Sequence, residues 1–190
     1  GEVFNSPKKF YNEQILSDIN QIKVRVLVKY PNRKWYCIWS NVHSPGINHI
    51  AKNTWYKVIH DIIPTQKRMH EISRNSSNSC VKCGDTDTIE HRLTACDKAK
   101  PIWNKLQRLL SIICRTTSLY FTPDIFIWPD YKWYPSTKNN TVNWLIAYTI
   151  QYILYDHFLM SEEEYMDYLR RSRWKTLSPE TQKKLFANFL

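Results

Sequence analysis

The feature that most constrains this chain is a set of three cysteines and one histidine with the spacing C-x2-C-x7-H-x4-C. The four residues are Cys80, Cys83, His91 and Cys96. Three thiolates and one imidazole are ligands that a closed tetrahedral zinc site requires. Because the set leaves no position open for water or substrate, it predicts one structural Zn²⁺, not a catalytic one. The Cys80–Cys83 pair fits a tight turn, and Gly84 directly after it relieves the backbone there.

The second pair of ligands is expected at the end of a short helix. Residues 88–95 are predicted to be helical, but His91 and Cys96 are five positions apart. An unbroken helix would therefore direct their side chains to different faces. The helix is expected to end just before Cys96, so that both ligands converge within a zinc-binding loop over residues 78–97.

Two alternatives to a zinc site remain open. Cysteine is often buried without any metal, so the set could be ordinary core cysteines beside a surface histidine. Against this, the polar residues 76–79 offer no apolar face that would bury Cys80. A disulfide between Cys80 and Cys83 is disfavoured because nothing in the sequence indicates secretion.

The composition favours a helical fold. At 190 residues the chain is long enough for one domain with its own core, and eight Trp and twelve Tyr supply bulky anchors for it. Only three Gly argue against an all-β fold rich in tight turns. The predicted fold class is therefore mainly α: a single helical domain over residues 1–190 with an embedded CCHC zinc knuckle. Residues 1–30 fit either a peripheral helix or a linker from a longer protein.

Helix boundaries in the first half of the chain follow from capping residues. Ser44-Pro45 predicts the start of one helix, because Pro is favoured at the first helical position. Thr65 is expected to cap a short basic helix. In that helix, Met69 and Ile72 are expected to face inward.

The second half predicts four further helices, of which the last starts at Ser178-Pro179. Residues 101–113 form an amphipathic pattern with Pro in the first turn. Residues 141–160 are nearly uncharged but carry too many polar side chains for a membrane span, so they predict the central helix of the core. Ser161 followed by Glu164 is a capping box that starts the next helix.

The other cysteines and the N-terminus indicate a reducing compartment. Cys37 and Cys114 lie in apolar stretches and are predicted to be packed thiols. Residues 1–12 lack the apolar segment of a signal peptide. A nuclear and/or cytoplasmic location is therefore expected.

The net charge of +10 is concentrated in residues 1–83, which hold thirteen Lys/Arg against five Asp/Glu. Such a surplus attracts polyanions, although it could also serve only solubility. Exposed aromatic side chains such as Tyr36 or Trp103 could stack on unpaired bases, but Trp103 lies on an amphipathic helix and is better interpreted as core. The candidate phosphate contacts lie near the zinc ligands: Lys67, Arg68, Arg74, Lys82 and Arg92.

The order of several landmarks supports a family resemblance. They are Trp35 to Trp39, Asn53-Thr54-Trp55-Tyr56, residues 59–65, the zinc ligands around residues 87–93, and Ile102-Trp103. This order resembles the zinc-binding domain at the C-terminus of non-LTR retrotransposon reverse transcriptases, especially arthropod LINE-type proteins. The resemblance covers roughly residues 30–190 and is most specific around the CCHC motif. It implies a region downstream of the polymerase that helps to hold template RNA or target DNA during target-primed reverse transcription.

Catalytic motifs are missing from the sequence, so the chain itself is not expected to be an enzyme. It lacks the Tyr-x-Asp-Asp carboxylate pair that holds the two metals of nucleotidyl transfer. Some relatives carry a nuclease after the zinc motif, and Asp124 and Asp130 match its acidic residues superficially. These two aspartates are six residues apart, and aspartates in loops beside Pro are usually turn residues.

Two hypotheses of different classes follow. The first is a nucleic-acid-binding accessory domain with RNA and/or DNA as its partner. The second is a domesticated, retrotransposon-derived module that binds a protein partner and uses zinc only to hold its fold. Neither requires a membrane. The salt dependence of oligonucleotide binding distinguishes them, because phosphate contacts weaken steeply with salt and apolar interfaces do not.

Overall fold

The computed structural model describes residues 32–73, 77–114, 123–131, 136–155, 161–172 and 179–186. The chain divides into two units, Gly1–Arg33 and Lys34–Leu190, and nearly all described residues belong to the second. The described part is helical and contains no strand, which confirms the predicted mainly α fold class. The expectation for residues 1–30 lies outside the described residues.

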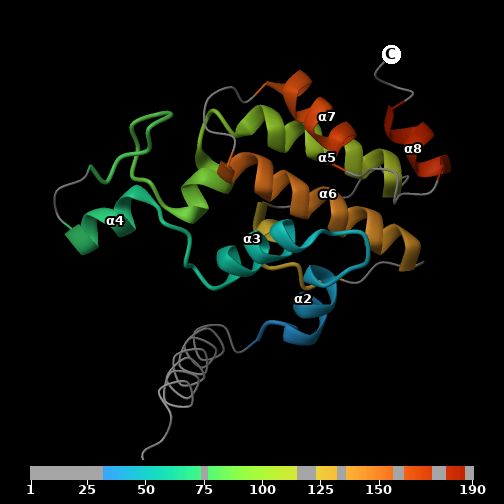
Figure 1. Ribbon diagram of the computed structural model, residues 1–190, viewed down its shortest axis with the longest axis horizontal. Helices are drawn as coiled ribbons and strands as arrows, with labels where there is room; N and C mark the ends of the chain where they lie inside the picture. Colours follow the sequence, from blue (N-terminus) through green and yellow to red (C-terminus); the bar gives the residue numbers. More distant parts are fainter. Residues whose placement is uncertain are drawn as a thin grey trace, which may run out of the picture. The chain divides into compact units, whose positions relative to one another are not determined.

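The described helices are labelled in Figure 1 in chain order. They are α2 (Trp35–Val42), α3 (His49–Ile59), α4 (Gln66–Ser73), the π-helix η1 (His91–Ala95), α5 (Lys100–Cys114), the 3₁₀ helix η2 (Pro123–Phe126), α6 (Ser136–Tyr155), α7 (Glu162–Arg171) and α8 (Pro179–Phe186).

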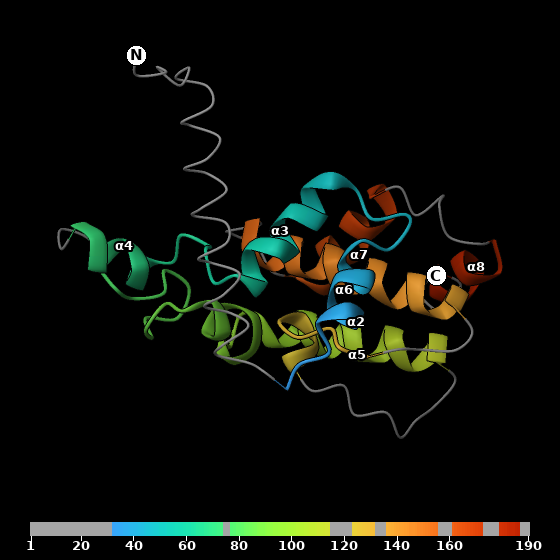
Figure 2. The ribbon, with the colours of Figure 1, turned by 90° about the horizontal axis from the view of Figure 1, so that it is seen from below.

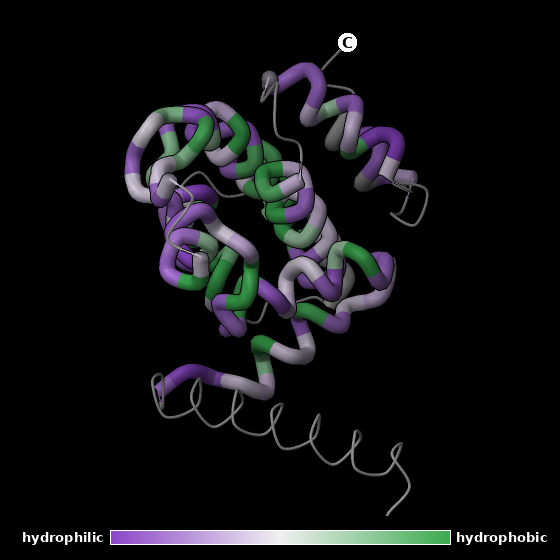
Figure 3. Tube along the Cα trace, turned by 60° about the vertical axis from the view of Figure 1, so that its left-hand side comes forward, coloured by the Kyte–Doolittle hydropathy of each residue, from purple (hydrophilic) through white to green (hydrophobic). Residues whose placement is uncertain are grey.

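Helix α6 is the centre of the second unit. It packs against α2 and α3 on one side and against α5 and α7 on the other (Figures 1 and 2). All its side chains from residue 141 to residue 150 are buried, as predicted for the central core helix. Among the described helices, none is long and apolar enough to cross a membrane. Hydrophobic and hydrophilic stretches alternate along the tube in Figure 3, the pattern of helices that bury one face.

A buried polar network joins α6 to α2. Asn143 is fully buried, and its Nδ2 donates hydrogen bonds to Asn41 Oδ1 at 3.1 Å and to Ser44 Oγ at 2.5 Å. The Tyr131 hydroxyl donates to Asn143 Oδ1 at 2.6 Å, and Asn41 Nδ2 donates to the carbonyl of Pro129 at 2.7 Å. The network therefore ties the loop after η2 to both helices, and the hydrogen bonds offset the cost of burying these amides.

The predicted start of α3 at Ser44-Pro45 is wrong. The N-cap is Asn48, whose Oδ1 accepts a hydrogen bond of 2.8 Å from the Ala51 amide. The hydroxyl of Ser44 is instead buried against Asn143, so it belongs to the core network and caps no helix.

Other predicted caps are confirmed. Thr65 Oγ1 accepts a hydrogen bond of 3.3 Å from the Arg68 amide in the first turn of α4. Ser161 Oγ accepts one of 3.1 Å from the Glu164 amide, as a capping box requires. Pro101 lies in the first turn of α5, where its missing N–H has no intrahelical partner to lose.

Helix α4 differs from the prediction because it buries no side chain at all. Met69 is 41% exposed and Ile72 is 71% exposed, so the expectation that both face inward is wrong. In Figures 1 and 2, α4 lies at one end of the unit, beyond the other helices. A helical repeat of apolar residues predicts a buried face only where a second element covers it, and no described element covers this one.

Candidate metal centre and its surroundings

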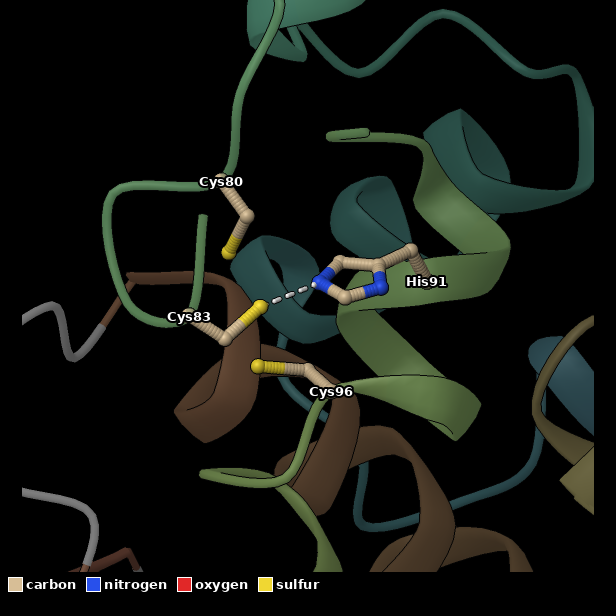
Figure 4. A group of neighbouring side chains, drawn as sticks. All are labelled: Cys80, Cys83, His91 and Cys96. Carbon is tan, nitrogen blue, oxygen red and sulfur yellow. Dashed lines mark hydrogen bonds between the residues drawn. The ribbon is translucent and has the colours of Figure 1, made fainter. Parts of the chain in front are cut away.

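The four side chains that the sequence singles out lie together. The ligand atoms of Cys80, Cys83, His91 and Cys96 are all within 4.8 Å of one another. Figure 4 shows the three sulfurs and the imidazole converging on a common point, with Cys83 Sγ and His91 Nε2 3.1 Å apart. A disulfide is absent, since all these cysteines are free thiols.

The first two ligands come from the predicted tight turn. The Gly84 amide donates to the carbonyl of Cys80 at 2.8 Å, and the Cys80 amide donates to the carbonyl of Asp85 at 2.6 Å. Gly84 has φ of 89°, a conformation that residues with a Cβ rarely adopt. A single backbone bridge between Ser79 and Thr86 closes the base of the turn. The turn therefore holds Cys80 and Cys83 on one side of the loop.

The other two ligands converge through a π-helical turn. Thr88 Oγ1 accepts a hydrogen bond of 3.0 Å from the His91 amide and caps the short helix. The Cys96 amide then donates to the carbonyl of His91 at 2.8 Å, five residues back, and the backbone becomes extended at Cys96. The helix ends before Cys96 as predicted. Its wider i→i+5 turn, which the sequence analysis did not predict, brings residues five apart close together.

This arrangement fits a tetrahedral metal ion. Ligand atoms at ordinary zinc distances form a tetrahedron with edges of roughly 3.5–3.8 Å. The largest separation of 4.8 Å therefore needs only a contraction of about 1 Å, which side-chain rotation can supply. The donor set of three sulfurs and one ring nitrogen is typical of structural zinc sites. The residues present can hold one such ion.

The crowding of the thiols affects Cys83. The backbone hydrogen bond from Asp85 lowers the pKa of Cys83, but desolvation and the neighbouring thiols of Cys80 and Cys96 together raise the pKa to about 12. Without a cation, the Cys83 side chain therefore favours the neutral thiol. A metal ion reverses this preference, because it binds thiolates and displaces their protons.

Asp87 connects the metal centre to α4. Its carboxylate is 1% exposed and accepts two hydrogen bonds from the Arg92 guanidinium, at 2.6 and 2.5 Å. The same carboxylate accepts a hydrogen bond of 2.5 Å from the Gln66 amide at the start of α4. Burial raises the pKa of Asp87, but these bonds to Arg92 and Gln66 outweigh it and hold the pKa below its usual range. Asp87 thus fixes the N-terminus of α4 against the metal-binding loop.

The sequence analysis missed Asp87. The available signal was its place beside Thr88, at the start of a helix, with Arg92 five residues later. In sequence such an Asp resembles an ordinary helix-terminus or turn residue. Only the fold shows that its carboxylate is buried and accepts a hydrogen bond from the first residue of a different helix, α4.

The structure gives different surroundings to the candidate phosphate contacts. Lys67 is exposed on α4, and Arg68 is exposed there with its guanidinium donating to the carbonyl of Asp61 at 2.5 Å. Lys82 Nζ lies 3.5 Å from the carbonyl of Ile153 near the end of α6. Arg92 is bound by Asp87, as described above. Arg74 lies outside the described residues.

Lys67 and Arg68 also line a pocket of about 460 Å³ between α4 and the metal-binding loop. Asp61 and Glu71 line the same pocket, together with Thr65, Ile72, Thr88 and Ile89. Two carboxylates opposite two cations leave the pocket without a strong excess of positive charge. The pocket is therefore not a preformed anion site.

Comparison with known proteins agrees with this geometry. Residues 11–103 match the model of a family described as zinc-binding in reverse transcriptase. The matched segment contains all four ligands and ends at Trp103 in α5. This segment of the chain is therefore similar to a family whose description names metal binding in reverse transcriptases. No curated protein and no solved structure matches the chain.

Replacing Cys83 with Ser should lower metal affinity by more than about a hundredfold, since even the loss of a side chain that only hydrogen-bonds to a metal ligand costs 10- to 100-fold. Cys114→Ser is the control, because Cys114 is buried in α5 away from the cluster and should leave metal affinity unchanged. Titration with cobalt, followed by the visible absorption of tetrahedral thiolate-bound Co²⁺, measures both. For the wild type, affinity should fall as pH falls, because protons compete for the ligands. Equal affinities of the two variants would contradict the ligand assignment.

Asp87→Ala should destabilise the protein by about 1–3 kcal/mol, because it leaves the Arg92 guanidinium and the Gln66 amide without their acceptor. Because the folded-state pKa of Asp87 is lowered, this contribution is present above about pH 4 and lost as pH falls through the folded pKa. Asp97→Ala is the matched control: it breaks an exposed pair with Lys100 and should change little. Urea denaturation measures both variants. Similar midpoints would show that Asp87 does not connect α4 to the loop.

Proposed function

We propose that this chain is a nucleic-acid-binding accessory domain of a retrotransposon reverse transcriptase, held together by one structural Zn²⁺. The observation that carries the proposal is the match of residues 11–103 to the family described as zinc-binding in reverse transcriptase. The Cys₃His cluster and the formal charge of +10 support it. The domain would engage RNA or DNA during target-primed reverse transcription, in the nucleus and/or the cytoplasm.

The proposed zinc ion has a structural role. Cys80, Cys83, His91 and Cys96 would occupy all four positions of a tetrahedral ion, so no position remains for a reacting water. Zinc bound there would cross-link the loop and would take no part in a chemical reaction. The polymerase chemistry would belong to another part of the parent enzyme, and this chain would be non-catalytic.

Lys67 and Arg68 are the basic residues best suited to contact phosphate, because both are exposed. Lys82 and Arg92 are directed at the carbonyl of Ile153 and at Asp87. Their contribution would be to hold the loop against α6 and α4. Contacts to phosphate give affinity without sequence information, so the proposed binding is not specific to one sequence.

A protein partner is the second candidate. The observation that favours it is the exposure of Met69 and Ile72 on α4, which present apolar surface next to the metal-binding loop. Apolar anchors of this kind are typical of helix-mediated protein contacts. In that case the zinc would only maintain the fold, and oligonucleotide binding would be weak.

The double variant Lys67→Glu, Arg68→Glu should weaken oligonucleotide binding at least tenfold and reduce the dependence of log K on log salt by about one per lost phosphate contact. The control variant is Arg171→Glu, Lys183→Glu, which changes the net charge equally on α7 and α8. Fluorescence anisotropy over a salt series measures both. If the two variants bind alike, α4 is not the phosphate-binding surface. If the wild type shows no salt-dependent binding at all, the result favours the second candidate function, binding of a protein partner.

A further inference from the structure

A row of aromatic rings lies between α2 and α3, away from the metal centre. The rings of Trp35 and Trp39 are stacked with centroids 6.2 Å apart and an interplanar angle of 26°. The ring of Trp39 stacks in turn on His60, at 5.6 Å and 18°. Tyr56 packs beside this row, 5.9 Å from Trp39 and 4.2 Å from His60. Nearly parallel rings of this kind are an arrangement that a planar base can extend.

Unlike the core aromatics, several of these rings reach the surface. Trp35, Trp39 and Tyr56 are partly exposed, whereas Trp55 and Trp144 are fully buried. Tyr36, three residues before Trp39 on the outer side of α2, is 79% exposed. Burial in the core explains Trp55 and Trp144, but it does not explain a large aromatic side chain left in water. By contrast Trp103, the other candidate for base stacking, is buried against Phe126, with ring centroids 4.7 Å apart.

Along α2, α3 and the segment between them the charged residues are all basic, and the first carboxylate after them is Asp61. Residues 34–60 contain no Asp or Glu, but they contain Lys34, Lys52 and Lys57. Lys52 lies one helical turn before Tyr56 on α3, so the two side chains share a face. Cations beside aromatic rings, without carboxylates, are the combination found in proteins that bind single strands. The pocket beside α4 lacks this combination, because the carboxylates of Asp61 and Glu71 line it.

We propose that the α2–α3 surface, defined by Trp35, Tyr36, Trp39, Lys52 and Tyr56, binds single-stranded nucleic acid. Unpaired bases stack on the exposed rings, and the lysines contact the phosphates. This inference rests on the proposed function and extends it, because it names a second surface and an unpaired strand as its ligand. The exposed stacked rings beside Lys52 favour this occupant over a protein, because stacking rings together with cations match the bases and phosphates of an unpaired strand.

The test separates stacking from phosphate contact. The probes are strands of about twelve nucleotides, within the site sizes of single-strand binders: oligo-dT, oligo-U, and an abasic strand with the same phosphates. The variant Tyr36→Leu, Trp39→Leu removes two flat rings but keeps apolar volume. Tyr56→Leu is a second variant in case the first one does not fold. The control is Tyr155→Leu, which removes a 52% exposed ring at the end of α6.

The expected result is that the α2–α3 variants bind oligo-dT and oligo-U roughly five- to a hundredfold more weakly per ring lost. Their affinity for the abasic strand should stay at the wild-type value, as should all affinities of Tyr155→Leu. A loss for only one of the two base-bearing strands supports the proposal and identifies the strand as DNA or RNA.

Unchanged binding of both base-bearing strands overturns the proposal, and so does an equal loss for the abasic strand. If binding then still falls in Lys67→Glu, Arg68→Glu, the proposed function stands and only the α2–α3 surface is wrong. Absence of wild-type binding to every probe overturns the proposed function together with this inference. The Tm of each variant is measured beside that of the wild type, so that a loss of binding caused by unfolding is recognised.

Discussion

The convergence of three thiols and one imidazole is the constraint on which the metal-binding loop depends. Within residues 78–97, the buried side chains other than the ligands are Asp87, Ile89 and Leu93. Two aliphatic side chains cannot offset the ordering of this segment, because fixing each backbone residue costs about 1–2 kcal/mol. Metal binding can supply the difference, since binding free energy at such a site is also folding free energy. The ordered conformation of the loop therefore depends on metal binding at the cluster.

Besides the packing of η1 against α5, α6 and η2, polar contacts join the loop to α4 and α6. Asp87 binds Arg92 within the loop and the amide of Gln66 at the start of α4. Because α4 buries no side chain, polar contacts fix its N-terminus: the Asp87 carboxylate, the Thr65 hydroxyl, and the hydrogen bonds from the Lys67 amide to the Asp87 carbonyl and from Arg68 to the Asp61 carbonyl. Lys82 approaches the carbonyl of Ile153 and so joins the loop to α6. The position of the basic helix thus follows from the metal centre and not from hydrophobic burial.

The sequence predicts the parts of this structure that depend on local spacing. The turn at Cys80–Cys83, the central helix around residues 141–150 and the cap at Ser161 each follow from neighbouring residues, and the structure has them. The metal ligands also follow from spacing, although the sequence does not reveal that a π-turn aligns His91 with Cys96. Two backbone geometries can bring ligands five residues apart together: a helix that ends before the second ligand, or a helix with a wider π-turn. The spacing alone does not distinguish them.

What the sequence did not predict depends on contacts between distant segments. Ser44 was expected to start a helix, but its hydroxyl bonds to Asn143, 99 residues later. Met69 and Ile72 were expected to face a core, but both are exposed on α4. The aromatic row is a similar case: Trp39 and Tyr56 look like core residues until the fold shows which rings remain exposed. A single side chain's environment is a property of the packed elements around it.

Hydrogen exchange with and without a metal chelator tests most directly whether the cluster orders the loop and α4. The account predicts that chelation removes protection from the Cys96 amide, bonded to His91, and from the Gln66 amide, bonded to Asp87. The amides of α6 around residues 142–150 should remain protected, because α6 also packs against α2, α3, α5 and α7, which lie outside the loop. Unchanged protection at Cys96 and Gln66 in metal-free protein would contradict the central role of the metal centre.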